Sequence, residues 1–464
     1  MNRPFHWRTR AAAAAVAALA LGVVAGCSSS SSSSTSAAAP ASSGTSSSAA
    51  ASSPAASSTA SASTVSTSAC GTKPGVKATG TPINLGAIDT DEPGTDFSDI
   101  ENMAGAYFAC VNANGGINGH PVKFFPTTEQ TSPSQIASLA KQLVTSDHVV
   151  GIVGSSSIIE CSVDSAYWKS VGIDVLGAGI DPECWSTPNT ASVNMGPRYS
   201  SDGATSFVIS KGATKIAFDQ SNVPGTTYIA DGPNAIAAAA KVPITDYTEN
   251  VPLTSADSVA IKLVDAAGPS GAVVLNFTPP EALLILQAAQ KLNLEDRVKY
   301  WACSTPCNTN SLAASLGPKW NDKLFVNSEL APLTGDNTPT AQLYLAILKQ
   351  YGSDVSGGIG SFSQMGFVDA EIATHALEGI KGAYTIPSVS AAIKGVSNFN
   401  TGMECQLFTY GNYSEHIPNN EDYTVTVDNG VMVPYKGCTL ISNVDPQIAA
   451  YRAIAGTAPL APAS

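Results

Sequence analysis

Short apolar runs alternate with segments of helical periodicity from residue 83 onward, and this alternation limits the possible fold more than any other feature of the sequence. The series begins with apolar runs at 83–88, 122–125 and 149–154, each followed by a segment of helical spacing, at 98–113, 134–144 and 161–171. Ser98, with Glu101 three residues later, predicts a capping box at the start of the first helix. Short apolar runs that alternate with amphipathic helices predict a parallel sheet with helices on both faces.

The segment ANGGINGHP, between the first helix and the second strand, contains residues that end one element and begin the next. Gly115 or Gly116 can adopt the left-handed conformation that ends a helix. Asn118-Gly119 predicts a tight turn, and Pro121 can begin a strand, where its missing N–H matters least. These residues place a helix end, a turn and a strand start within nine positions of the sequence.

A second strand-and-helix series follows residue 196, with strands at 215–220, 242–250, 271–277 and 298–303. After Glu329 we expect two further helices, at 340–352 and 367–380, and then a hairpin at 423–435 around the turn residues Asp428-Asn429-Gly430. The roughly 395 residues from Cys70 onward exceed the usual size of one domain. We therefore expect an α/β protein with two doubly wound parallel-sheet lobes and a cleft between them.

The N-terminal segment has the features of a lipoprotein signal. Arg3, Arg8 and Arg10 precede an apolar run that ends in VVAGC, and Cys27 follows small residues at the position of a lipid-modified cysteine. We expect residues 1–26 to be a signal peptide and Cys27 to be the lipid anchor. Ordinary secretion, with cleavage within the Ser/Ala tract, is the alternative. Residues 27–69 are almost entirely Ser, Ala, Thr, Pro and Gly, a composition that predicts a flexible linker.

Charge and cysteine content restrict the environment of the folded region. The chain carries 23 Lys+Arg against 36 Asp+Glu, which argues against nucleic acid as a partner. Apart from Cys27 the chain has an even number of cysteines, which in an exported protein indicates disulfides. Of the 105 possible pairings we expect neighbours in the chain to pair. The eight cysteines are Cys70, Cys110, Cys161, Cys184, Cys303, Cys307, Cys405 and Cys438. A zinc site at Cys303 and Cys307 would lack a second ligand pair, and no metal or cofactor is expected.

The motifs INLGAI, VNANGGINGHPVKF, QTSPSQIASLAKQLV, VVGIVGSSS and IDVLGAG follow one another in an order that resembles the leucine/isoleucine/valine-binding family. These proteins are type I periplasmic substrate-binding proteins of ABC importers. The resemblance runs from about Pro82 to Tyr435. It implies two lobes joined by a three-strand hinge and ligand capture by hinge closure. Lobe 1 would comprise 70–199 and 331–405, and lobe 2 would comprise 200–330 and 406–464.

The same resemblance implies a set of ligand-binding residues at the carboxyl ends of strands, where helix N-termini offer free N–H groups. The serine and small-residue positions would bind a ligand carboxylate, and the aromatic position would pack on the ligand side chain. Phe97 could equally be a hydrophobic staple, Ser157 fits a helix cap, and Trp185 and Tyr228 fit packing and surface positions. The expected ligand-binding residues are Phe97, Ser155, Ser156, Ala178, Gly179, Ile180, Phe277, Thr278 and Ser304.

Some positions depart from the pattern of that family. Ile180 replaces a hydroxyl residue, and Phe277 or Thr278 stands where an aromatic closes over the ligand. Around WACSTPC no acidic residue is present to pair with an α-ammonium group, and Ser304 and Thr305 are the nearest residues. Because a buried ammonium group without a partner is costly, we expect a carboxylate, an amide or another neutral molecule rather than an α-amino acid. Asp89, Asp91 and Glu281 would be available for a cation.

Enzyme functions do not fit the sequence. Neither Ser155 nor Ser156 is followed two residues later by glycine, as a nucleophile elbow requires, and no histidine is suitably placed as a base. No nucleotide-binding glycine motif follows a strand. We therefore expect a monomeric, lipid-anchored binding protein on the extracytoplasmic face of a bacterial membrane. It would deliver a small molecule to an ABC permease, and a ligand sensor without a transport role is the alternative.

Overall fold

The computed structural model describes residues 70–335, 338–410, 421–441 and 444–455. The expected anchor Cys27, the signal peptide and the linker lie outside these residues. Within them, no helix is both long and apolar enough to cross a membrane.

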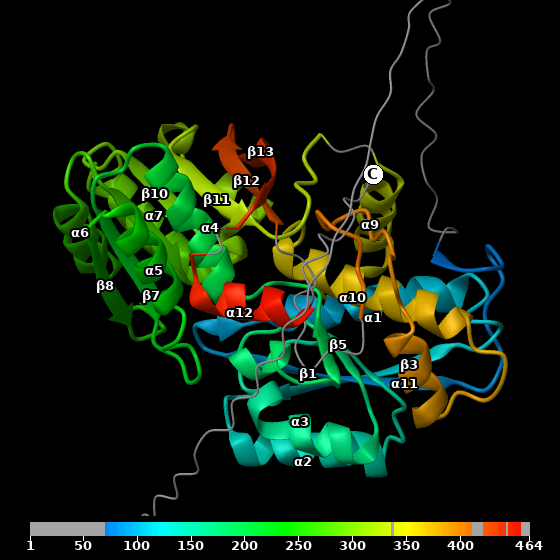
Figure 1. Ribbon diagram of the computed structural model, residues 1–464. Helices are drawn as coiled ribbons and strands as arrows, with labels where there is room; N and C mark the ends of the chain where they lie inside the picture. Colours follow the sequence, from blue (N-terminus) through cyan, green and yellow to red (C-terminus); the bar gives the residue numbers. More distant parts are fainter. Residues whose placement is uncertain (1–69, 336–337, 411–420, 442–443, 456–464) are drawn as a thin grey trace, which may run out of the picture. The chain divides into compact units, whose positions relative to one another are not determined.

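Lobe 1 contains the first sheet and its helices (Figure 1). Its elements before the second sheet are β1 (Ile83–Glu92), β2 (Thr95–Asp96), α1 (Ser98–Ala113), β3 (Val122–Glu129), α2 (Pro133–Thr145), β4 (Ile152–Ser155), α3 (Glu160–Val171), β5 (Val175–Gly177), η2 (Pro182–Trp185) and β6 (Thr190–Ser192). Later in the chain it gains α9 (Pro339–Tyr351), α10 (Ser361–Glu378) and α11 (Ile386–Lys394). The strands β3, β1, β4, β5 and β6 are parallel and adjacent in this order, and β2 pairs antiparallel with the end of β1.

Helices cover both faces of the first sheet, as the predicted doubly wound arrangement requires. Leu85 and Val153 point into a core shared with α1 and α10. Ile88 and Ile152 point into a separate core shared with α2 and α3. Because neighbouring residues of a strand face opposite sides of its sheet, one apolar run supplies both cores.

Lobe 2 contains the second sheet. Its elements are α4 (Pro197–Ser210), β7 (Ile216–Ser221), α5 (Asp231–Ala240), β8 (Ile244–Glu249), α6 (Ala256–Ala267), β9 (Ala272–Asn276), α7 (Pro279–Lys291), β10 (Tyr300–Cys303), η3 (Thr305–Cys307), α8 (Asn310–Ser315), η4 (Pro318–Trp320), β11 (Leu324–Ser328), β12 (Glu421–Asp428), β13 (Val431–Leu440) and α12 (Pro446–Ala455). The strand order is β13-β12-β11-β10-β9-β7-β8. The hairpin β12–β13 adds two antiparallel strands to a parallel sheet, and its turn residues Asn429 and Gly430 have φ of 48° and 81°, as the turn signal predicted.

The chain passes between the lobes where the two sheets end. One passage lies between β6 and α4, and a second follows β11. The third precedes β12. Phe408 and Tyr410 belong to the core of lobe 1, so the packing of that lobe extends beyond Cys405, where the boundary was predicted.

Several local predictions differ from the structure. Helix α1 begins at Ser98, so the N-cap position is Phe97 and Ser98 does not cap the helix; the Ser98 hydroxyl donates to Asp96 Oδ1 at 2.7 Å. Two helices were missed in the C-terminal part, α11 and α12, and α10 begins at Ser361, earlier than predicted. The turn at Asn118-Gly119 is present, with Ile117 and His120 exchanging backbone hydrogen bonds.

The eight cysteines form four disulfides in the chain order that was predicted: Cys70–Cys110, Cys161–Cys184, Cys303–Cys307 and Cys405–Cys438. The first two lie within lobe 1 and the third within lobe 2. The fourth joins a residue near the core of lobe 1 to strand β13 of lobe 2.

Candidate functional site

A cavity of about 660 Å³, including space open to solvent, lies between the lobes at the carboxyl ends of strands from both sheets. We call it the inner cavity. Its lining residues come from the segments that follow β1, β4, β5 and β6 in lobe 1 and β7, β9, β10 and β11 in lobe 2, and from the first turns of α1 and α10. They are Thr95, Phe97, Ile100, Ile158, Ala178, Gly179, Ile180, Asn194, Gly196, Pro197, Ser221, Val223, Thr226, Ile229, Asn276, Phe277, Thr278, Thr305, Pro306, Glu329, Phe362 and Met365.

The wall of the inner cavity is mainly apolar. Phe97 and Phe362 stand together in lobe 1 with ring centroids 5.1 Å apart, and Phe277 lines the opposite lobe. Among the described lining residues none is a lysine, arginine or histidine. A ligand in this cavity would therefore bury an apolar body and meet only a few polar groups.

Among the described residues that line the inner cavity, Glu329 is the one acidic residue. It follows β11, and its Oε2 accepts the Met195 N–H at 2.9 Å from another passage between the lobes. Burial raises the pKa of the Glu329 carboxyl to about 8, although the N–H groups of Met195 and Gly196 and the hydroxyl of Thr305 lower it. At pH 7 the carboxyl is therefore mostly protonated, and it can donate a hydrogen bond.

The sequence analysis overlooked Glu329. No acidic residue was expected around WACSTPC, but Glu329, which lies outside that segment, places a carboxyl group in the inner cavity. The signal was present, because Glu329 directly follows the buried strand LFVNS and so lies at the carboxyl end of the sheet.

Six of the residues predicted to bind a ligand line the inner cavity: Phe97, Ala178, Gly179, Ile180, Phe277 and Thr278. Gly179 is held by Asn194, which accepts the Gly179 N–H at 2.7 Å and donates to its carbonyl at 2.9 Å. A Cβ at Gly179 would overlap with Ser192 Oγ and lie 2.8 Å from the ring of Trp185, so only glycine fits between these side chains.

Ser155, Ser156 and Ser304 do not line the inner cavity. Ser155 and Ser156 line a smaller adjacent cavity, which shares Ala178 and Gly179 with the inner one. Both hydroxyls form hydrogen bonds within lobe 1. Ser155 Oγ accepts the Ile88 N–H of β1 at 2.9 Å, and Ser156 Oγ donates to the Phe97 carbonyl at 3.5 Å. Ser304 Oγ donates to Asn276 Oδ1 at 2.7 Å and so orients a lining residue. Their roles in ligand binding stay predictions.

Trp185 is a packing residue, as expected, because it is buried and donates from Nε1 to the Asn194 carbonyl at 3.1 Å.

Tyr228 does not occupy the surface position that was expected. Its hydroxyl donates to the carbonyl of Ile180 in the other lobe, and Thr278 Oγ1 donates across the lobes to the Gly94 carbonyl at 3.1 Å. These two hydrogen bonds connect the lobes at the cavity and form only when the lobes are close together.

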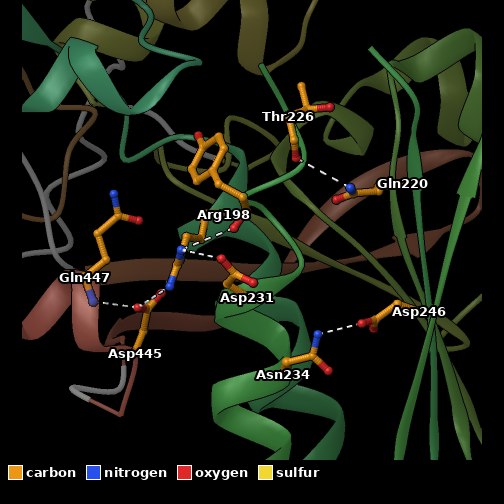
Figure 2. Close-up of polar contacts among 9 residues, drawn as sticks. Arg198, Gln220, Thr226, Asp231, Asn234, Asp246, Asp445 and Gln447 are labelled. Carbon is orange, nitrogen blue, oxygen red and sulfur yellow. Dashed lines mark hydrogen bonds and ion pairs between the residues drawn. The ribbon is translucent and has the colours of Figure 1, made fainter. Parts of the chain in front are cut away.

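Two side chains donate hydrogen bonds to the loop that carries Thr226 and Tyr228, and Figure 2 shows the bond between Gln220 and Thr226. Gln220 Nε2 donates to the Thr226 carbonyl at 3.5 Å, and Arg198 Nη1 donates to the Tyr228 carbonyl at 3.2 Å. Arg198 also forms a bidentate pair with Asp445, with both N···O distances 2.7 Å, and both side chains are buried. The segment that begins α12 therefore helps to position the loop that contacts the opposite lobe.

Two groups of side chains within the described residues have metal-ligand spacing: Cys161, Asp181 and Cys184, and Cys405, Glu421 and Cys438. In both groups the cysteines are joined in disulfides, so their sulfur atoms are not available as thiolate ligands.

The fold and the cavity define a class of protein that holds a small ligand between two α/β lobes. The family model described as "Periplasmic binding protein" matches residues 82–430, and the chain belongs to this family. Its members are binding proteins and not enzymes. A comparison with curated proteins found no match.

Solved structures share the fold over most of the chain. A branched chain amino acid ABC transporter protein from Thermus thermophilus with bound valine matches with a TM-score of 0.68 and 17% identity, covering 80% of this chain and 99% of its own. A fatty acid ABC transporter substrate-binding protein from Thermomonospora curvata matches with a TM-score of 0.65 and 16% identity, covering 81% and 95%. A solute binding protein from R. palustris in complex with 4-hydroxybenzoate matches with a TM-score of 0.60 and 15% identity, covering 76% and 96%.

Proposed function

We propose that this chain is an extracytoplasmic solute-binding lipoprotein that captures a small organic molecule in the inner cavity and delivers it to the permease of an ABC transporter. The observation that carries the proposal is an apolar cavity between the lobes with one carboxyl group, Glu329, in its lining. Family membership supports a binding role, and the similar structures are described as transporter binding proteins for an amino acid, a fatty acid or an aromatic acid.

The ligand, in this proposal, has an apolar body and a carboxylate or amide group. The carboxyl group of Glu329, protonated at neutral pH, would donate a hydrogen bond to an oxygen of that group, and Asn276 and Thr305 add polar groups nearby. An amino-acid-like ligand is the alternative, because an ammonium group would favour the ionised form of Glu329 instead.

Binding would shift the population toward the closed arrangement. The hydrogen bonds of Tyr228 and Thr278 to the opposite lobe are available only in that arrangement, and a ligand that contacts both walls adds to them. Cys27 would hold the protein at the outer face of the membrane through its lipid, the segment 27–69 would act as a tether, and the protein would act as a monomer.

The test is the pH dependence of affinity, measured after a thermal-shift screen of carboxylates, amides, aromatic acids and branched-chain amino acids has identified a ligand. A carboxylate ligand should lose affinity as pH rises above about 8, up to about tenfold per pH unit, because Glu329 must regain its proton on binding. In Glu329→Gln this dependence should disappear, while affinity at pH 7 changes only a few-fold because the amide also donates a hydrogen bond.

Glu371→Gln is the matched control. Burial also raises the pKa of Glu371 to about 8, but this residue does not line the inner cavity, so the pH dependence should remain. A ligand whose affinity rises above pH 8 and collapses in Glu329→Gln would establish the amino-acid-like alternative. If no member of the screen raises the melting temperature, the proposed ligand class is wrong.

A further inference from the structure

A second cavity adjoins the inner one between the lobes. It has an empty volume of about 880 Å³, including space open to solvent, and we call it the outer cavity. Lobe 1 contributes Asp96, Asp99 and the segment 356–360, and lobe 2 contributes Pro279 at the start of α7 and Ser311 and Ser315 of α8. Phe362 lines both cavities.

Neighbouring residues of the chain line different cavities. Thr95 and Phe97 line the inner cavity, whereas Asp96 between them lines the outer one. In lobe 2, Thr278 lines the inner cavity and the next residue, Pro279, lines the outer one. Among the described lining residues, Phe362 is the one that the two cavities share.

The two cavities differ in chemistry. The inner cavity is mainly apolar. The outer cavity also has apolar walls, formed by Pro279, Pro280, Leu283, Leu312 and Phe362, but it adds serine and threonine side chains, glycines and two aspartates. No lysine or arginine is among the described residues that line the outer cavity. Hydroxyl groups of a ligand would find acceptors there, and an anionic group would be repelled by Asp96 and Asp99.

One wall of the outer cavity is firmly held. Asp99 Oδ1 accepts the Ser356 N–H at 2.7 Å, and Asp99 Oδ2 accepts the Gly357 N–H at 2.8 Å. These bonds attach the segment before α10 to the first turn of α1, close to the Phe97–Phe362 pair. The outer cavity is thus bounded on this side by hydrogen-bonded backbone from two elements.

We propose that the outer cavity is a second ligand subsite, which takes the uncharged, hydroxyl-bearing end of an elongated carboxylate whose head and apolar part occupy the inner cavity. Phe362, in contact with Phe97, is the movable partition that the ligand displaces. This inference rests on the proposed function, because it assumes that the carboxylate head is bound at Glu329.

The experiment measures the dissociation constants of four probes by calorimetry: hexanoate, decanoate, 10-hydroxydecanoate and decanedioate. Hexanoate tests the inner cavity alone. Among the ten-carbon probes, 10-hydroxydecanoate should bind about tenfold more tightly than decanoate, because its terminal hydroxyl can form hydrogen bonds in the outer cavity. Decanedioate should bind about tenfold more weakly than 10-hydroxydecanoate, because its second carboxylate would meet the two aspartates.

Three variants test whether this discrimination arises in the outer cavity. Asp96→Asn keeps the side-chain oxygen that accepts from Ser98 but removes a charge, and it should reduce the preference for 10-hydroxydecanoate over decanedioate several-fold. Asp257→Asn makes the same change in charge at an exposed position outside both cavities and should leave the preference unchanged. Phe362→Ala should weaken hexanoate binding, because an apolar wall is lost, but should weaken 10-hydroxydecanoate less.

The outcomes separate this inference from the proposed function. If hexanoate binds and the three longer probes bind no better and without discrimination, the second subsite does not exist, whereas the proposed function stands. Discrimination that persists unchanged in Asp96→Asn would also overturn the subsite. If none of the four probes binds, the extension is wrong, whereas the proposed function is decided by the wider thermal-shift screen.

Discussion

The carboxyl group of Glu329 lies both at the passages between the lobes and in the lining of the inner cavity. Glu329 directly follows β11, at the start of one passage between the lobes, and it lines the inner cavity. Its carboxyl group accepts the N–H of Met195, which lies in another passage. A ligand that changes the protonation of Glu329 therefore also changes the strength of a hydrogen bond between two hinge segments.

The buried pair of Arg198 and Asp445 predicts a large difference between two conservative substitutions. Burial raises the pKa of Asp445, but the hydrogen bonds from Arg198 outweigh it and lower the pKa below its usual range. Asp445→Asn would leave the Arg198 guanidinium buried without its main partner, and we expect a loss of about 3–5 kcal/mol in the free energy of unfolding. Urea unfolding measures this loss.

Asp231→Asn is the control for this prediction. Asp231 lies 3.8 Å from the same guanidinium, but its side chain is 72% exposed. Loss of its charge should therefore lower the free energy of unfolding by less than about 1 kcal/mol. Equal effects of the two substitutions would show that burial does not determine the strength of this ion pair.

Part of the site was predictable at the scale of residues. Ala178 and Gly179 were expected from the family resemblance and from their place after a buried strand, whereas Thr278 was expected from the resemblance alone; all three line the inner cavity. The positions of the serine hydroxyls were not predictable in the same way. The direction of a hydroxyl depends on its partners, and Ser155 and Ser156 find theirs at Ile88 and Phe97, which lie far away in the sequence.

At the scale of elements, the Cys161–Cys184 disulfide holds the loop that contributes Ala178, Gly179 and Ile180 to the cavity. It joins α3 to η2, which directly follows this loop, and Asp181 supports the same junction by accepting the Ser162 N–H at 3.1 Å. The loop therefore has one end in strand β5 and the other end at a covalent link.

The double substitution Cys161→Ser/Cys184→Ser should lower both stability and affinity. The loss of the link should cost about 3–4 kcal/mol in the chain-entropy model, and a looser loop should weaken binding of an identified ligand by about tenfold. Urea unfolding and calorimetry measure the two quantities.

Cys70→Ser/Cys110→Ser supplies the comparison. This disulfide closes a somewhat longer segment of lobe 1, away from the inner cavity, so it should cost a similar free energy of unfolding with little change in affinity. If both double variants lose affinity equally, the disulfide near the cavity has no specific role in shaping it.

Most strands of both sheets were predicted, because they are short apolar runs, but β6 and β11 were missed. Helices α11 and α12 were missed, since α11 is short and α12 follows a hairpin at the end of the chain. The capping prediction at Ser98 failed because the helix begins at Ser98 itself, which puts Phe97 at the N-cap position.

At the scale of the whole molecule, many carboxyl groups are buried with pKa values raised by burial. The pKa is raised to about 8 for Glu160, Glu329 and Glu371 and to about 7 for Asp181, Asp219 and Asp422. Between about pH 4 and pH 8 the folded protein thus binds more protons than the unfolded chain, whose carboxyls ionise near pH 4.

Stability should therefore fall as the pH rises from 5.5 to 8. Each extra proton held by the folded state makes the free energy of unfolding decrease by about 1.4 kcal/mol per pH unit in this range. Urea unfolding at several pH values, without ligand, measures the slope. A free energy of unfolding that stays constant or increases from pH 5.5 to 8 would mean that these carboxyls are ionised in the folded protein.

The fourth disulfide makes the third passage between the lobes part of a covalent ring. Cys405 lies beside the core of lobe 1 and Cys438 in strand β13 of lobe 2, so the segment between them leaves and returns to the same cross-link. A protease that cuts one peptide bond inside this ring releases no fragment under oxidising conditions. The ring thus keeps the hairpin β12–β13 attached to the rest of the protein even after the backbone beside the hinge has been broken.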